Sequence, residues 1–156
     1  MSPQLITPEL IASVTEAARR SPRRRMNHNF HTGPGDNPHR FLNVFLRGSY
    51  VAPHRHLHPP KAESFLVLEG SMVAVVFRED GSIHERHRIG PGEPAWGIDL
   101  TPGVWHTVAA LSEVAVCYEV KPGPWDPASD KEFATWAPRE GDAAAGGYLE
   151  RLLAEL

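Results

Sequence analysis

The pattern that most constrains the fold is a series of short apolar segments between about residues 41 and 120. These segments lie at residues 41–46, 64–68, 72–77, 105–111 and 114–120, and Gly- or Pro-containing turns separate several of them. A further segment at residues 83–89 alternates apolar and polar residues only loosely, so we interpret it as an edge strand. Many short strands with no helical period between them predict a sandwich or a closed barrel rather than a βαβ sheet.

Both flanks of this strand region are expected to contain a helix. Thr7 can cap an N-terminal helix that begins with Pro8, and Ser21-Pro22 ends it. Near the other end of the chain, residues 122–127 form an extended segment rich in Pro and Gly. An amphipathic helix is expected further on, with Tyr148, Leu149, Leu152, Leu153 and Leu156. We therefore expect one all-β domain over residues 1–156, covered by flanks at about 1–25 and 121–156.

Composition excludes several classes of function. The formal net charge of −3 gives no electrostatic reason to expect nucleic acid or an anionic membrane as a partner. No apolar run reaches about 18 residues, which argues against a transmembrane helix. The single cysteine, Cys117, lies in an apolar run and is expected to be a buried, inert thiol. The N-terminus lacks a secretory signal pattern, so we expect a cytoplasmic protein.

The residues that carry chemistry are concentrated around a His-x-His pair. On a strand, His54 and His56 point to the same side, where two imidazoles can bind one ion. Glu63 opens the following strand, and His106 follows a Pro102-Gly103 turn much later in the chain. These four residues are our candidate metal ligands, and such imidazole–carboxylate sets suit one divalent ion of Zn, Mn, Fe or Ni. His58 shares the strand parity of the pair and is a rival ligand.

A second group of polar residues is a candidate ligand-binding surface. If residues 27–31 form a strand, Asn27, Asn29 and His31 share one face that could line a pocket. Arg25 and Arg40 could hold a phosphate, although a solvated structural role is the usual one for such residues. The four tryptophans are interpreted as core or interface residues rather than sugar-stacking platforms. Trp105 in particular should point away from the metal cavity, because it alternates with His106.

The motif spacing resembles that of the cupin superfamily. Gly48 is followed after five residues by His54-Arg55-His56, then after six residues by Glu63, and after six more by Gly70. A second motif is similar in Gly97, Pro102-Gly103 and His106. The gap before Glu63 is two residues longer than in the usual cupin motif, and the second motif lacks its terminal Asn. The resemblance implies a single jelly-roll β-barrel with a metal site.

A closer resemblance, to the WbuC-type cupin-fold metalloproteins, covers nearly the whole chain. It rests on the stretches 25–31, 53–65, 105–107, 119–124 and 130–138, together with Arg40 and the Leu5-Ile6-Thr7 helix start. In that family the longer gap before the carboxylate is normal. The resemblance implies an association with polysaccharide or O-antigen gene clusters and a homodimer that covers exposed strand edges.

These observations leave three hypotheses for function. The first is an enzyme that isomerises or epimerises a small carbohydrate or nucleotide-sugar. The second is an Fe(II)-dependent dioxygenase, because three histidines and a glutamate suit iron and leave positions open on it. The third is a non-catalytic protein that binds a small molecule, with the metal as an anchor. Neither the reaction nor its substrate follows from the sequence.

Overall fold

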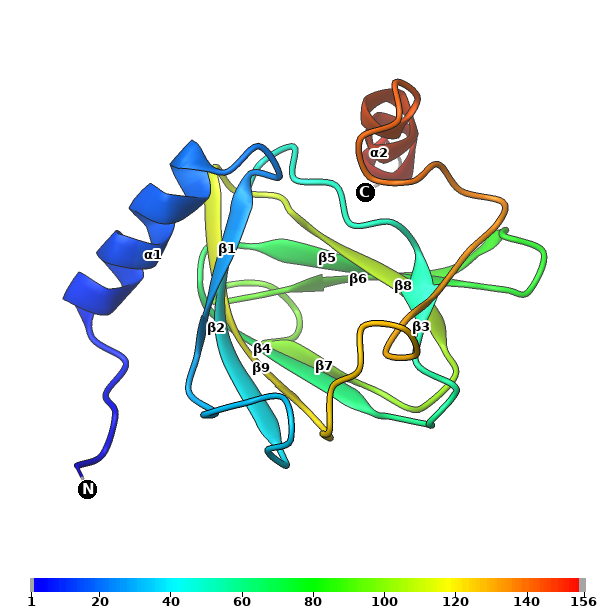
Figure 1. The fold of residues 1–156 in the computed structure, drawn as a ribbon. Helices are drawn as coiled ribbons and strands as arrows, with labels where there is room; N and C mark the ends of the chain where they lie inside the picture. The colour runs from blue at the N-terminus through cyan, green and yellow to red at the C-terminus, as the bar shows by residue number, and fades with distance from the viewer. Residues whose placement is uncertain (1, 155–156) are drawn as a thin grey trace.

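Two five-stranded antiparallel sheets face each other in the computed structural model, which describes residues 2–154 (Figure 1). The first sheet has the order β1 (Arg25–Asn29), β2 (His39–Leu46), β9 (Val114–Lys121), β4 (Glu63–Glu69) and β7 (Gly97–Leu100). The second has the order β10 (Glu132–Phe133), β3 (His54–Arg55), β8 (Trp105–Ala110), β5 (Met72–Phe77) and β6 (Ile83–Ile89). Two helices, α1 (Pro8–Arg20) and α2 (Ala145–Leu153), flank the sheets.

The main core lies between the two sheets, because alternate residues of each strand point inward. Phe45 and Cys117 from the first sheet meet Met72 and Val108 from the second in one buried cluster. Burial raises the pKa of the Cys117 thiol well above its ordinary value. The predicted all-β jelly-roll architecture is therefore confirmed, and residues 83–89 form an edge strand as expected.

The helices cover the outer faces of the sheets, one on each side (Figure 1). The side chain of Thr7 accepts a hydrogen bond from the backbone N–H of Leu10 at 3.2 Å, which caps α1 as predicted. One apolar stripe of α1 packs on Leu42, Val44 and Leu46 of β2. The helix α2 packs on the outer face of the second sheet, and Leu156, which we expected to extend it, lies outside the described residues.

Two glycines make close approaches that hold strand connections together. Gly70 has φ +75°, and a Cβ added there would lie 2.3 Å from the carbonyl oxygen of Val114. Gly103 has φ +83°, and its N–H donates to the carbonyl of His56 at 3.1 Å. The second contact ties the loop before β8 to the loop after β3, so the two motifs that carry histidines are joined through the backbone.

The segment between β9 and α2 crosses the open end of the barrel (Figure 1). Its short strand β10 pairs with β3, with Glu132 opposite Arg55 and Phe133 opposite His54. We refer to residues 122–134 as the strap. The sequence predicted an extended segment over residues 122–127 but neither β10 nor its pairing with the His-x-His strand, and it also missed β7.

None of the helices found in residues 2–154 combines the length and apolar character needed to span a membrane.

Candidate metal centre

Four side chains from three strands and one loop converge inside the barrel. His54 on β3 lies directly opposite His106 on β8, and Glu63 opens β4 of the facing sheet. His56 follows β3 and points to the same side as His54. All four side chains are buried, and their candidate ligand atoms lie within 4.8 Å of one another. The structure thus brings together the four residues that the sequence singled out as ligands.

The backbone fixes the orientation of each imidazole. The Nδ1 atom of His54 lies 2.9 Å from the carbonyl oxygen of Ala52, and the Nδ1 atom of His106 lies 2.9 Å from that of Val104. The Nδ1 atom of His56 is in contact with the carbonyl oxygen of Asp130 on the strap. A carbonyl oxygen only accepts hydrogen bonds, so each Nδ1 is the donor. With Nδ1 held by the backbone, each ring turns its Nε2 atom to the interior.

The Nε2 atoms of the clustered histidines are buried and placed as the ligands of a metal ion would be. Among residues 2–154, the buried Nε2 atoms of His54 and His56 have no hydrogen-bond partner. The Oε2 atom of Glu63 lies 3.0 Å from Nε2 of His106 and 3.5 Å from Nε2 of His56. Ligand atoms bound at about 2.0–2.2 Å to one ion cannot lie more than about 4.4 Å apart, so a small contraction would close the site. The donor set therefore fits one divalent cation.

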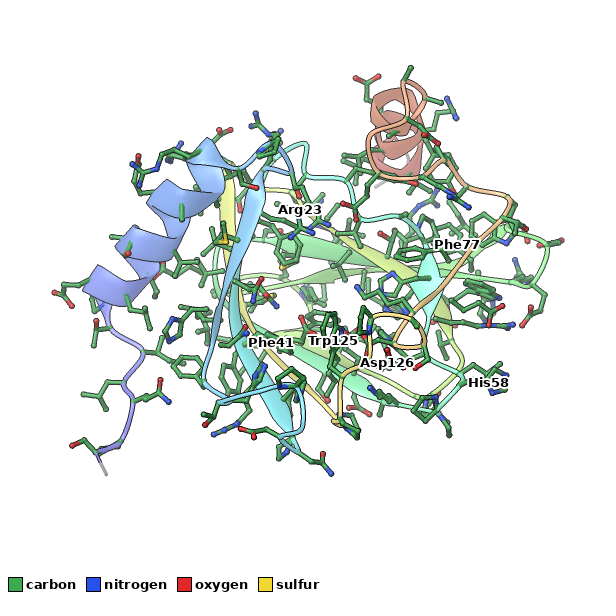
Figure 2. All side chains as sticks on the ribbon, in the orientation of Figure 1. Arg23, Phe41, His58, Phe77, Trp125 and Asp126 are labelled. Carbon is green, nitrogen blue, oxygen red and sulfur yellow. The ribbon has the colours of Figure 1, made fainter. Side chains whose placement is uncertain are left out.

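His58, the rival ligand, lies outside this cluster. Its side chain is exposed on the loop after β3, and Figure 2 shows it at the periphery of the molecule. The strand parity that it shares with His54 and His56 does not bring it inward, because β3 ends at Arg55 and a turn follows. The structure places Glu63 and not His58 beside the three buried imidazoles.

The pKa shifts of His54 and Glu63 favour the protonation states that bind a metal ion. Burial lowers the pKa of His54 well below its ordinary value, and the charge of Lys131 adds to this effect. Burial alone would raise the pKa of Glu63, but the contacts of its carboxylate with the imidazoles of His106 and His56 outweigh it and hold this pKa well below the usual range. At neutral pH the imidazole of His54 is neutral and the carboxyl of Glu63 is ionised. Metal ions bind these forms.

A charged network that the sequence did not reveal supports this centre. The buried carboxylate of Asp130 accepts hydrogen bonds from Lys61 at 2.8 Å and from Lys121 at 3.0 Å. Lys121 in turn lies 3.9 Å from Oε1 of Glu63 and 3.9 Å from Oε1 of Glu119. Because Asp130 also contacts His56 through its backbone carbonyl, the network connects the strap to the metal ligands. The local sequence pattern could not predict this network, because Lys61 and Asp130 are 69 positions apart in the chain.

Three members of the cluster, His54, Glu63 and His106, line a cavity of about 530 Å³. Three of the predicted ligand-binding residues, Asn27, Asn29 and His31, line it. The Nδ1 atom of His31 lies 3.1 Å from the backbone nitrogen of Arg40 and 3.1 Å from its carbonyl oxygen. Other lining residues, which the sequence did not single out, are Arg23, His39, Phe41, Asn43, Glu119, Lys121, Trp125 and Lys131.

Two of these additional residues are ionisable groups in unusual surroundings. Glu119 accepts a hydrogen bond from Nδ2 of Asn43 at 2.6 Å. Burial and the nearby charge of Glu63 raise the pKa of Glu119 to about 8. Burial lowers the pKa of Lys131, although the carboxylates of Glu63 and Glu119 oppose this shift. The cavity therefore contains a carboxyl group, that of Glu119, able to exchange a proton near neutral pH.

The two arginines that we expected to bind phosphate lie differently from each other. Arg25 lines the cavity, but its Nη2 donates to both carboxylate oxygens of Glu140, at 2.6 and 2.7 Å. Its Nη1 donates to the carbonyl of Tyr50 at 3.0 Å, so the guanidinium is already engaged. Arg40 does not line the cavity. Alternation along β2 puts Arg40 on the face that packs on α1, together with Leu42.

The tryptophans divide into two kinds. Trp105 is buried on the outer face of its sheet, where it contacts Trp136, as the sequence predicted. Trp96 and Trp125 are 60% and 43% exposed, so neither is a core residue. Trp125 lines the cavity, as does Phe41 (both labelled in Figure 2). The interpretation of every tryptophan as a packing residue therefore does not describe Trp125.

The fold and this cluster define a cupin-type jelly-roll barrel with a candidate centre for one divalent metal. A family model described as "Domain of unknown function (DUF6016)" matches residues 6–89, and the chain belongs to that family. No curated protein matches the chain.

Several solved structures are similar to this chain in fold. An L-ribose isomerase from Geodermatophilus obscurus has a TM-score of 0.57 and 14% sequence identity, over 80% of this chain and 71% of that one. KdgF from Halomonas sp. has a TM-score of 0.51 and 17% identity, over 65% and 81%. The capsular polysaccharide assembling protein CapF from Staphylococcus aureus has a TM-score of 0.54 and 20% identity, over 69% of this chain and only 29% of CapF. The TM-scores indicate a shared fold, and at these low sequence identities the similarity indicates nothing beyond the fold.

Proposed function

We propose that this protein is a metal-dependent cupin enzyme that isomerises or epimerises a small sugar or a nucleotide-sugar. The observation that carries the proposal is the buried cluster of His54, His56, Glu63 and His106, three of which line a cavity that also has many hydrogen-bonding side chains. A purely structural metal site would be closed by protein ligands on every side. Here the cluster faces a cavity of about 530 Å³, a volume in the range of small-molecule sites.

The four clustered residues would hold one divalent ion, for which Zn, Mn, Fe and Ni are the candidates. When bound, such an ion supplies Lewis-acid polarisation of a carbonyl or hydroxyl oxygen of the substrate. The carbonyl contacts of His54, His56 and His106 fix the rings before any ligand arrives, which favours a preorganised site.

The cavity walls offer the remaining functions that a sugar isomerisation needs. The carboxyl of Glu119 lies outside the metal cluster and can hold or release a proton at its Oε atoms. The amides of Asn27, Asn29 and Asn43 can bind hydroxyl groups. The half-exposed ring of Trp125 can pack against the apolar face of a sugar. A pocket with many hydrogen-bonding groups suits a hydroxylated substrate better than an apolar one.

The finer assignments form part of the same proposal. We place the chain with the WbuC-type cupin metalloproteins and propose a role in polysaccharide biosynthesis in the cytoplasm, as a homodimer. The strap residues in the WbuC-like stretch 130–138 support this placement, since Asp130 contacts a ligand of the metal centre. Two exposed apolar side chains offer surface for a dimer contact. Leu66 lies on β4, and Trp96 directly precedes the edge strand β7.

The experiment is an exchange assay on metal-loaded protein. Sugars and nucleotide-sugars are incubated in heavy water with the Zn, Mn, Fe or Ni form, and NMR follows deuterium uptake and new isomers. We include aldopentoses, because one structural neighbour is an L-ribose isomerase. The proposal predicts turnover of at least one compound, its loss in Glu63→Gln and a large decrease in Glu119→Gln at unchanged metal content.

Other outcomes of this assay would favour the two remaining hypotheses. Oxygen consumption by the iron form alone, with no exchange, would replace the proposal with a dioxygenase. Binding without turnover in every metal form would instead indicate a non-catalytic binding protein. The control His58→Ala, which changes an exposed histidine outside the cluster, should behave like the unmodified protein.

A further inference from the structure

Lys131 is a cationic side chain in the cavity wall that has no direct partner among the described residues 2–154. It lines the same cavity as the metal cluster, and its charge lowers the pKa of His54 more than any other nearby charge does. Within residues 2–154 its ammonium group makes no hydrogen bond and no close ion pair. A partly buried ammonium group without a partner is unfavourable, because desolvation is not repaid by a contact.

The strap holds Lys131 in place on both sides. Before it, Asp130 is buried and bound by Lys61 and Lys121. After it, Glu132 forms an ion pair with Arg55 at 2.9 Å outside the cavity. Glu132 thus points outward to Arg55, whereas the side chain of Lys131 lines the cavity. The backbone of Lys131 is therefore fixed before a ligand binds.

The carboxylates nearest to Lys131 are already engaged with other groups. Asp130 is shared between two other lysines, and Glu63 contacts the inner nitrogen atoms of two histidines. Glu119 accepts from Asn43 and lies 3.9 Å from Lys121. None of these three groups is available as a close counter-ion for Lys131. The position is suited to a negative group brought by the ligand itself.

We propose that Lys131 binds an anionic group, a carboxylate or a phosphate, on the ligand of this cavity. This inference rests on the proposed function, and it narrows the substrate class to acidic or phosphorylated sugar-sized compounds. The metal centre and Lys131 would then hold two points of one molecule. Lys131 is thus a specificity-determining residue, distinct from the metal ligands and from Arg25, whose guanidinium is occupied by Glu140.

A binding experiment separates this inference from the proposed function. Calorimetry measures binding of glucuronate, inorganic phosphate and glucose to zinc-loaded and to metal-free protein. Glucuronate and phosphate represent the two anion sources, and glucose is the neutral comparison. We expect at least one anion to bind about tenfold or more tightly than glucose, because a charge-assisted contact is typically of this size. Added salt should reduce the preference.

Three variants identify the group responsible. Lys131→Met removes the charge at similar length and should abolish the preference for the anion while the zinc content stays unchanged. Lys131→Arg keeps the charge and should retain a preference. Arg23→Gln removes another cation that lines the same cavity and is exposed, and it should leave the preference intact.

Several results would overturn the inference. They are a wild-type protein that binds glucose as well as either anion or binds no probe, a preference that survives in Lys131→Met, and equal losses in Lys131→Met and Arg23→Gln. Since the readout is binding, an absence of isomerase activity would contradict the proposed function without affecting this result. Conversely, turnover of a neutral sugar with no anion preference would support the proposed function and refute the role of Lys131.

Discussion

Replacing Asp130 with Asn tests the charged network that supports the metal centre. The Asp130 carboxylate is 3% exposed and bonds two lysines at 2.8 and 3.0 Å, so an amide would leave both buried cations short of a counter-ion. Removing one partner from a buried pair costs about 3–5 kcal/mol of folding free energy. For a chain of this size that corresponds to a decrease in Tm of roughly 6–20 °C. Urea unfolding of metal-free protein at neutral pH measures the free energy directly.

The pH dependence of the same variant gives a signed test. Burial would raise the pKa of Asp130, but hydrogen bonds from Lys61 and the charge of Lys121 lower it below its ordinary value of 3.8. The ionised group therefore stabilises the fold above the unfolded-state pKa of about 3.9, and this stability is lost as the pH falls through the folded-state pKa. The difference between wild type and Asp130→Asn should thus shrink on acidification below about pH 4.

The control is Glu132→Gln, which breaks a pair with Arg55 in which Glu132 is 46% exposed. Exposed pairs contribute about 0–1 kcal/mol, so this variant should remain close to wild type. The reasoning is refuted if Asp130→Asn is no less stable than Glu132→Gln at neutral pH, or if the deficit of Asp130→Asn grows as the pH falls.

Three further predictions concern the helix cap, the cysteine and the metal. Thr7→Ala should lower the free energy of unfolding by about 1 kcal/mol, because the first turn of α1 loses its side-chain cap; a Thr7→Ser variant with the same deficit would contradict the capping role. Cys117 should react with a thiol reagent only after denaturant is added, since burial raises its pKa well above the ordinary value; rapid labelling of folded protein would disprove this. Zinc affinity, measured against a competing chelator, should fall on acidification below the ordinary histidine pKa of about 6.5, because protons then compete for the imidazole of His54, whose own pKa is lowered by burial; a constant affinity would argue against histidine ligands.

The convergence of His54, His56, Glu63 and His106 could be predicted from the sequence because strand alternation and turn residues determine much of it locally. His54 and His56 share a side by parity, and the Pro102-Gly103 turn starts the strand that carries His106. The position of Arg40 could have been derived in the same way. It alternates with His39 and Phe41, so it belongs to the face of Leu42 and lies away from the cavity.

Contacts between distant segments could not be predicted in this manner. Arg25 pairs with Glu140 across 115 positions, and nothing in the local pattern of either residue indicates the other. Within the strap, only residues 122–127 were recognised as extended and turn-rich. The roles of Asp130 and Lys131 depend on the course of the strap over the barrel opening, which that local pattern does not determine. The half-exposed Trp125 was assigned to packing because large aromatic residues are usually buried, whereas this one lines the cavity.

The most direct test of the central claim is the metal content of protein purified without an affinity tag or a metal column, determined by elemental mass spectrometry. The account predicts close to one divalent ion per chain in the wild type and in His58→Ala. It predicts a severe loss in His106→Gln, whose side chain lies opposite His54 within the cluster. Equal metal content in the wild type and His106→Gln, or loss of the metal on changing His58, would contradict it.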